Sequence, residues 1–284
     1  MPTRHSAFSG SAALPDRTVV VTGAASGIGR ATSARLGAAG WRVVGIDLHD
    51  ADIVADLSTP EGRARAVEEA TGRSAGSLGA VVTCAGLAGT PGRAGSLLAS
   101  VNYFGTVELL TGLRPLLPPG GAAVAISSNS TTVQPGVPVD LVEALLAGDR
   151  ALSLRLADEH GAMATYPASK LAVAHWVRGQ AVGPDWSGAG LRLNAVAPGM
   201  IDTPMVAAMR ADDRTAPLLD MLPIPAGRPG RPEEIAALID FLLGADAGFF
   251  CGSVVFCDGG SDAALRTRDW PAAWDIAPAD FGRP

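Results

Sequence analysis

The first apolar run of the chain leads directly into a turn with three closely spaced glycines. The run is Thr18–Thr22, and its β-branched residues predict a short strand buried on both faces. The turn, Gly23–Gly29, precedes a helical stretch that closes near Gly40. Residues without a Cβ let main chain approach a pyrophosphate, and the start of the following helix offers unpaired N–H groups to phosphates. This order predicts a nucleotide-binding βαβ unit; the alternative is a strand–glycine–helix turn without a ligand.

Strands and helices alternate along most of the remaining chain. Further strands are predicted at residues 42–47, 53–56, 80–85, 122–127, 192–196 and 253–257. Helices are predicted at residues 61–71, 96–117, 166–183 and from 232 onward, with one or two more at 139–159. Because the strands are apolar on both faces, the pattern predicts an α/β fold: a doubly wound parallel sheet of the Rossmann type, covered by helices on both sides.

Composition excludes several classes of protein. The chain has 284 residues, 48% of them hydrophobic, and a net charge of −6, so its composition is neither that of a disordered chain nor that of a basic nucleic-acid surface. It has no apolar run of the roughly 18 residues that a spanning helix needs, and its start lacks the apolar core of a signal peptide. The cysteines and histidines show no metal-ligand spacing. We expect a cytoplasmic protein with no metal, no nucleic-acid partner and no membrane association.

One catalytic domain is expected from residue 17 to residue 264. Residues 1–16 are rich in Ser, Ala and Gly and are expected to form a flexible tail. Residues 265–284 form a predicted C-terminal tail whose aromatic side chains are expected to cover apolar surface, with a substrate-covering role as the less favoured alternative; these are Trp270, Trp274 and Phe281.

An acidic residue, Asp47, ends the second predicted strand. A carboxylate at this position can accept hydrogen bonds from the ribose hydroxyls of adenosine. It would also repel a 2′-phosphate, and the glycine turn contains no Lys or Arg to offset that repulsion. The sequence therefore favours NAD over NADP. The alternative for Asp47 is a solvated turn carboxylate, and Arg30 and Arg42 are the nearest cations.

Tyr166 and Lys170 lie four residues apart in a predicted helix, so their side chains share one face. The pKa of a free tyrosine is about 10, and a neighbouring ammonium favours the phenolate. Lys170 is therefore expected to lower the pKa of Tyr166 and make it an effective general base. Pro167 predicts that Tyr166 stands at the very start of the helix, because proline is tolerated in the first turn. A surface Tyr–Lys pair is the alternative.

Three other polar residues are candidates for the same site. Ser127 and Ser128 follow a predicted strand at the carboxyl edge of the sheet, where ligands bind in such folds. A hydroxyl there can polarise a substrate carbonyl; alternatively, both serines satisfy main-chain groups at the strand end. Asn102 lies inside an apolar helix, where asparagine has low propensity, so a specific hydrogen bond is expected.

Together these motifs resemble the short-chain dehydrogenase/reductase family over roughly residues 17–263. The matching motifs are TGxxxGIG at 22–29, YxxxK at 166–170 and a PG loop at 198–203. Relative to most members, the chain has a helical insertion at about residues 131–163, which is expected to form a wall or lid at the substrate entrance. This insertion and the late segment at 258–263 make the chain most similar to the bacterial 3α-hydroxysteroid dehydrogenase/carbonyl reductase group. The resemblance implies an NAD-dependent enzyme that interconverts a secondary alcohol and a ketone, with hydroxysteroids or other bulky hydrophobic carbonyl compounds as candidate substrates. The alternatives are a catalytically silent NAD-binding regulator and a dehydratase or epimerase.

The resemblance also assigns roles to residues. Tyr166 would be the general acid/base, and Ser128 would position the carbonyl or alcohol. Lys170 would bind the nicotinamide ribose, and Asn102 would hold a water in a proton relay. The implied cofactor-binding residues are Gly23, Ser26, Gly27, Ile28, Gly29, Asp47, Asp56, Leu57, Cys84, Ala85, Gly86, Tyr166, Lys170, Pro198, Gly199, Ile201 and Thr203.

Three further expectations concern single features of the chain. Cys84 stands where the family usually has asparagine, and we expect a buried thiol rather than a reactive one because no basic residue adjoins it. Met200, Met205 and Met209 follow the PG loop and form either an adaptable apolar lid or ordinary packing. The partners are expected to be a small-molecule alcohol or ketone and further copies of the chain, with a dimer through the last helix and strand favoured over a tetramer.

Overall fold

The computed structural model describes residues 17–273 and residue 275. Seven parallel strands form one sheet in the order β3-β2-β1-β4-β5-β6-β7. The order reverses between β1 and β4, and the carboxyl ends of strands at such a reversal are where ligands bind in this class of fold. The predicted doubly wound sheet is confirmed. The strands are β1 (Thr18–Thr22), β2 (Arg42–Asp47), β3 (Ile53–Val54), β4 (Ala80–Thr83), β5 (Ala122–Ile126), β6 (Arg192–Pro198) and β7 (Val254–Cys257).

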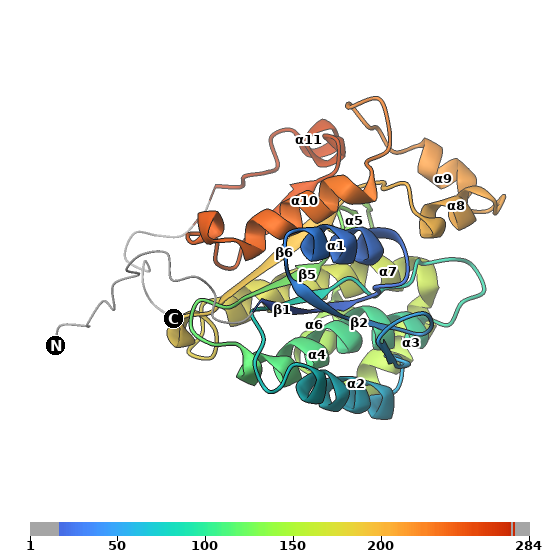
Figure 1. The fold of residues 1–284 in the computed structure, drawn as a ribbon. Helices are drawn as coiled ribbons and strands as arrows, with labels where there is room; N and C mark the ends of the chain where they lie inside the picture. Colours follow the sequence, from blue (N-terminus) through green and yellow to red (C-terminus); the bar gives the residue numbers. More distant parts are fainter. Residues whose placement is uncertain (1–16, 274, 276–284) are drawn as a thin grey trace.

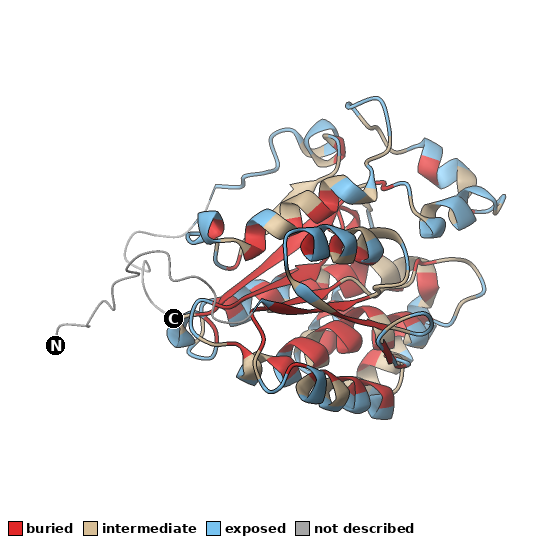
Figure 2. Cartoon of the chain, in the orientation of Figure 1, coloured by how far each residue is buried: buried red, intermediate tan, exposed pale blue. Residues whose placement is uncertain are grey.

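Helices cover both faces of the sheet (Figure 1). One face carries α1 (Gly27–Ala38) and α10 (Pro232–Leu243), which pack against each other. The other face carries α2 (Pro60–Arg73), α4 (Gly105–Leu113) and α7 (Arg150–Ala181). The central strands β1, β4, β5 and β6 are buried, whereas β7 and the ends of β2 and β3 are partly exposed, as are the outer faces of the helices (Figure 2). The shorter helices are α3 (Gly95–Leu98), α5 (Ser130–Val133), α6 (Val139–Leu146), α8 (Pro204–Arg210), α9 (Ala216–Asp220) and α11 (Ser261–Arg266).

The helix predicted at residues 96–117 is present over residues 95–116, but it is not α-helical throughout. It consists of α3, a π-helical segment η1 (Ala99–Phe104), α4 and a final 3-10 turn. Asn102 lies in the π-helical segment, and its side chain bonds to the main chain of Leu87 rather than within the helix. A wider helical turn at such a residue is a local feature that is frequent at functional sites.

Two predicted strands end earlier than expected. Strand β4 ends at Thr83 rather than at residue 85, because the N–H of Ala85 donates to the Oγ1 of Thr22 (3.0 Å) instead of continuing the ladder. Strand β3 ends at Val54 rather than at residue 56. The carbonyl of Val54 accepts a hydrogen bond from the side chain of Arg65 (2.6 Å). The other strands agree with the prediction to within two residues.

The predicted insertion contains α5, α6 and the first part of α7. Helix α7 has a kink at Gly161 (φ 77°), and helical geometry resumes directly after it. The expectation that Tyr166 starts the helix is therefore wrong: Tyr166 lies in the second turn after the kink, and Pro167 lies inside the helix. The proline is tolerated because the carbonyl that its missing N–H would serve, that of Met163, accepts a hydrogen bond from the side chain of Gln134 (3.2 Å).

The ends of the chain are described only in part. The predicted N-terminal tail at residues 1–16 and the aromatic residues Trp274 and Phe281 lie outside the described residues. Helix α11 continues to Arg266, past the predicted tail boundary at residue 265, and Trp270 beyond it is exposed. Among the helices that the structure describes, none has both the length and the apolar character that crossing a membrane requires.

Candidate active site

The glycine turn is fixed by close main-chain contacts. Gly23 and Gly27 adopt left-handed conformations (φ 69° and 50°), which side chains disfavour. A Cβ on Gly23 would lie 2.8 Å from the nitrogen of Ala85, and a Cβ on Gly29 would overlap the Gly23 carbonyl. The turn therefore requires glycine and brings bare main chain to the start of α1 at Gly27. This cradle fits the pyrophosphate of a dinucleotide.

Two acidic residues at the predicted adenosine side are held by main-chain N–H groups. Asp47 is half-buried; its Oδ2 accepts from the N–H of Ala25 in the glycine turn (2.9 Å), and its Oδ1 accepts from Leu48 (2.7 Å). Asp56 is exposed, and hydrogen bonds from Ser58 hold its pKa below the usual value. The side chain of the next predicted residue, Leu57, belongs to the apolar core, so only its main chain is available to a ligand.

Tyr166 and Ser128 meet at the carboxyl end of β5. Burial raises the pKa of Tyr166 because it disfavours the phenolate, and a hydrogen bond with the Ser128 hydroxyl opposes this rise. Burial also lowers the pKa of Lys170, to about 8. The expected lowering of the Tyr166 pKa by Lys170 is thus not found: burial favours the neutral forms of both side chains, and the Nζ of Lys170 donates to the carbonyl of Ile126 (2.9 Å).

The two candidate serines have different roles. The hydroxyl of Ser127 donates to the main-chain carbonyl of Lys170 (2.9 Å), so it connects β5 to α7. The hydroxyl of Ser128 accepts from the N–H of Ser130 (3.1 Å) and lines the same cavity as Tyr166. Of the two serines, Ser128 has the hydroxyl placed to contact a substrate.

Asn102 anchors the segment that follows β4. It is completely buried; its Oδ1 accepts from the N–H of Leu87 (2.7 Å), and its Nδ2 donates to the Leu87 carbonyl (3.0 Å). A Cβ on Gly86, beside this anchor, would lie 3.4 Å from the Nζ of Lys170. The specific hydrogen bond expected for Asn102 is present, and its partner is the main chain next to Lys170.

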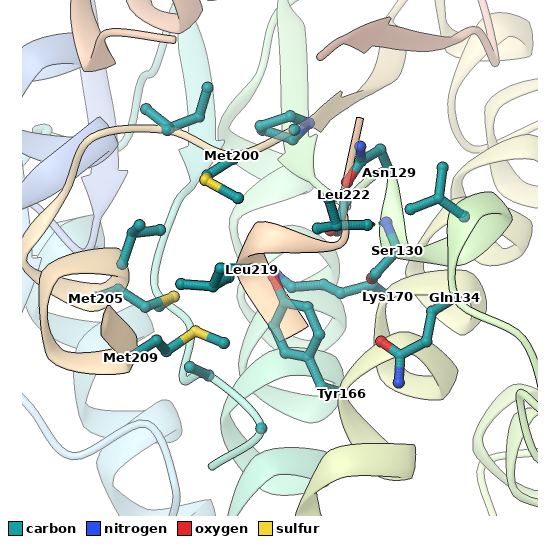
Figure 3. Close-up of a pocket in the computed structure, with 18 of the residues that line it drawn as sticks. Asn129, Ser130, Gln134, Tyr166, Lys170, Met200, Met205, Met209, Leu219 and Leu222 are labelled. Atoms are coloured by element: carbon teal, nitrogen blue, oxygen red, sulfur yellow. Dashed lines mark hydrogen bonds between the residues drawn. The ribbon is translucent and has the colours of Figure 1, made fainter. Parts of the chain in front are cut away.

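A cavity of about 520 Å³ opens beside Tyr166. Five of the six methionines of the chain line it. Three of them face Tyr166 from one side, whereas the polar residues Asn129, Ser130 and Gln134 lie on the other (Figure 3). The five methionines are Met163, Met200, Met205, Met209 and Met221.

The cavity gathers about half of the predicted site residues. Ser128, Tyr166 and Lys170 line it together with seven other predicted cofactor residues: Ile28, Cys84, Gly86, Pro198, Gly199, Ile201 and Thr203. Asn102 does not line the cavity. The remaining predicted cofactor residues lie in or beside the glycine turn, or at the ends of β2 and β3 where adenosine is expected to bind: Gly23, Ser26, Gly27, Gly29, Asp47, Asp56, Leu57 and Ala85. Burial raises the pKa of Cys84 to about 12, so this thiol is protonated at neutral pH, as expected for an unreactive residue.

Three site residues were not identified from the sequence. A Cβ on Gly89 would lie 2.6 Å from the Ala162 carbonyl and 2.9 Å from the Cβ of Tyr166, so this glycine permits a close approach to the catalytic helix. Asn129 donates from its Nδ2 to Asp258 (3.3 Å) and lines the cavity. Gln134 lines it as well. Only Asn129 carried a signal, because it directly follows Ser128.

A glycine turn after β1, a carboxylate at the end of β2 and a Ser–Tyr–Lys set beside a cavity at the carboxyl edge define a Rossmann-type oxidoreductase. The chain belongs to the short-chain dehydrogenase/reductase family. Residues 17–139 match the family model described as short chain dehydrogenase, and residues 153–262 match the model described as enoyl-(acyl carrier protein) reductase.

Full-length relatives agree with this assignment. The 3-alpha-hydroxysteroid dehydrogenase/carbonyl reductase of Comamonas testosteroni is 38% identical over 253 residues, which cover 87% of this chain and 97% of that protein. The cis-4-hydroxycyclohexanecarboxylate dehydrogenase of Sinomonas cyclohexanicum is 33% identical over 88% of this chain and 98% of its own length. The crystal structure of the 3-alpha-hydroxysteroid dehydrogenase from Pseudomonas sp. B-0831 complexed with NADH has a TM-score of 0.85 and 44% identity, and the match covers 88% of this chain and 99% of that one. The predicted family and enzyme class, a dehydrogenase/reductase acting on CH–OH groups, are confirmed.

Proposed function

We propose that this protein catalyses the reversible, NAD-dependent interconversion of a secondary alcohol and a ketone. The observation that carries the proposal is the convergence of Ser128, Tyr166 and Lys170 at one end of a largely apolar cavity. When bound, the nicotinamide supplies the acceptor or donor of the hydride. Ser128 would hold the substrate oxygen, Tyr166 would take or return its proton, and Lys170 would supply positive charge beside them.

The cofactor would lie across the carboxyl edge of the sheet. The glycine turn would hold the pyrophosphate, and Asp47 would accept hydrogen bonds from the adenosine ribose. Two main-chain N–H groups hold the carboxylate of Asp47 in place, where it would repel a 2′-phosphate. The nicotinamide would lie near Ile201 and Thr203, which line the catalytic cavity.

The substrate would be a bulky, largely hydrophobic alcohol or ketone; the names of two relatives indicate ring alcohols, a hydroxysteroid and a hydroxycyclohexanecarboxylate, for those proteins. The methionine wall supports this proposal, because unbranched thioether side chains adapt to irregular apolar ligands. Helix α8 contributes Met205 and Met209 to that wall, and α9 adds Leu218 and Leu219; Met205 and Leu218 are partly exposed to solvent. Leu265 of α11 also lines the cavity, which favours a contribution from the end of the chain to substrate binding.

The assembly we propose is a homodimer through α10 and β7. Phe249 is fully exposed next to β7, and Phe241 of α10 is also exposed. Strand β7 is at the edge of the sheet and only half-buried, and an exposed apolar patch beside an open sheet edge favours association. Light scattering should give a dimer mass, and F249D should shift it toward the monomer; a tetramer mass unaffected by F249D would refute this interface.

The remaining proposals concern location and domain limits. We propose a cytoplasmic protein with one catalytic domain at residues 17–264. The free thiols of Cys84, Cys251 and Cys257 support a reducing compartment.

The direct test of the function is a screen of purified protein with NAD and a panel of secondary alcohols, in which the formation of NADH is measured by its absorbance. The proposal expects NADH formation with at least one bulky alicyclic alcohol and a lower rate with small linear ones. Binding of NAD without NADH formation across the panel would instead favour a catalytically silent NAD-binding protein.

A further inference from the structure

Gln134 joins the wall of the cavity to the catalytic helix. It lies between α5 and α6, lines the cavity, and donates from its Nε2 to the main-chain carbonyl of Met163 (3.2 Å). Pro167 has no N–H to donate to that carbonyl from within the helix. The side-chain amide of Gln134 therefore replaces a missing helical hydrogen bond, one turn before Tyr166.

This hydrogen bond fixes which end of the amide is available to a ligand. A carbonyl oxygen can bond only to the NH₂ end of a glutamine, so the position of Oε1 is determined by its partner. In Figure 3 the Oε1 of Gln134 points toward Tyr166, whereas the Nε2 points away from it. The cavity wall thus presents a hydrogen-bond acceptor on the side that also carries the polar residues Asn129 and Ser130.

The acceptor and Tyr166 face the same cavity. Met163, whose carbonyl holds the Gln134 amide, precedes Tyr166 by three residues, so the two lie on one face of α7. Gln134 and Tyr166 both line the cavity, and the Oε1 points toward Tyr166 (Figure 3). A ring alcohol that reacts at Tyr166 can therefore direct a second substituent toward Gln134.

We propose that Gln134 is a specificity-determining residue whose Oε1 accepts a hydrogen bond from a second hydroxyl group of an alicyclic substrate. The inference rests on the proposed function, because it concerns the same cavity. A substrate without a donor at that place leaves the acceptor without a partner, and sites that are built to bond a substrate hydroxyl discriminate against analogues that lack it. The preferred substrates are then ring diols and hydroxyketones rather than purely hydrocarbon ring alcohols.

Three ring alcohols of similar size test the proposal: cyclohexane-1,4-diol, 4-methoxycyclohexanol and 4-methylcyclohexanol. At the ring position opposite the reacting hydroxyl, the methoxy compound can accept a hydrogen bond but not donate one. The methyl compound can neither donate nor accept there. For the wild-type protein, kcat/KM per reacting hydroxyl should be at least about fivefold higher for the diol than for either analogue, which is the effect of one neutral hydrogen bond. Equal values, or a preference for the methoxy compound, would overturn the proposal.

The variants Q134M, Q180M and Q134M/P167A separate substrate recognition from support of the helix. Q134M should remove the preference for the diol, whereas Q180M, the same change on an exposed part of α7, should retain it. P167A restores an N–H to the Met163 carbonyl, so the double variant should recover the melting temperature lost in Q134M but not the preference.

The preference ratio also distinguishes failure of this inference from failure of the proposed function. A diol preference that survives in Q134M, or that returns in Q134M/P167A, would show that Gln134 acts only on the helix and would overturn the inference. If the wild-type protein oxidises none of the three alcohols or any other alcohol tested, the proposed function itself fails.

Discussion

The Nζ of Lys170 donates a hydrogen bond to the main-chain carbonyl of Ile126, 2.9 Å away, and so joins the catalytic helix to the end of β5. A second bond runs in the opposite direction, from the Ser127 hydroxyl to the Lys170 carbonyl (2.9 Å). The lysine is 3% exposed. Its position beside Tyr166 therefore depends on the strand, and its charge is held in a largely dehydrated environment.

The buried ammonium should make stability depend on pH. Burial lowers the pKa of Lys170 to about 8 from 10.5, so between these values the unfolded state binds more protons than the folded state. Under this condition the free energy of unfolding increases with pH. We expect it to rise by about 2 kcal/mol between pH 8 and pH 10 relative to K170M, measured by urea unfolding. Parallel curves for the two proteins would contradict the assigned environment of Lys170.

Removal of the Asn102 side chain should destabilise the fold as well as the site. N102A leaves both main-chain groups of Leu87 without their partner inside the protein. Each unpaired buried polar group costs about 1–3 kcal/mol, so the free energy of unfolding should fall by roughly 2–4 kcal/mol. Chemical denaturation measures this loss; a change within about 0.5 kcal/mol would show that the anchor is dispensable.

Arg192 should be important for stability rather than for catalysis. Its guanidinium is buried and donates to four main-chain carbonyls at and after the end of α10: those of Leu242, Leu243, Gly244 and Ala247. R192M should lower the free energy of unfolding by about 3 kcal/mol or more, because these are charge-assisted bonds to buried acceptors. The control is R178M, at an exposed site on α7, which should change it by less than about 0.5 kcal/mol. Equal effects of the two substitutions would refute the assigned role.

Local patterns were sufficient to predict the sheet and to select the residues Ser128, Tyr166 and Lys170, which the structure brings together at one cavity. The glycine turn, Tyr166 and Lys170 belong to short motifs, and the strands are continuous apolar runs, so neighbouring residues determine them. The features that were missed depend on contacts between distant segments. The π-helical turn accompanies the pairing of Asn102 with Leu87, and the continuation of α7 through Pro167 depends on Gln134. Helices α8 and α9 were not predicted, because helices of seven and five residues are too short to show a clear apolar periodicity.

Asp47 should determine the choice of cofactor. Its carboxylate is fixed beside the glycine turn by Ala25, where it would accept from a ribose and repel a 2′-phosphate. The wild-type protein should bind NAD at least about tenfold more tightly than NADP, which is the expected effect of one unfavourable charge contact of about 1.4 kcal/mol. In D47A the preference should shrink, as isothermal titration calorimetry would show. Tighter binding of NADP by the wild-type protein would refute the assignment.

The central claim is that Tyr166 exchanges a proton with the substrate beside a bound nicotinamide. Its most direct test compares Y166F with the wild-type protein, using NADH absorbance for turnover of the best alcohol of the panel and calorimetry for NAD binding. Removal of a proton-transfer group at a reaction centre typically lowers the rate by about 10²–10⁴-fold, and the phenylalanine keeps the ring that packs in the cavity. We predict that kcat falls by at least about 100-fold while the dissociation constant for NAD stays within about threefold. A Y166F protein that oxidises the alcohol at the wild-type rate would contradict this account.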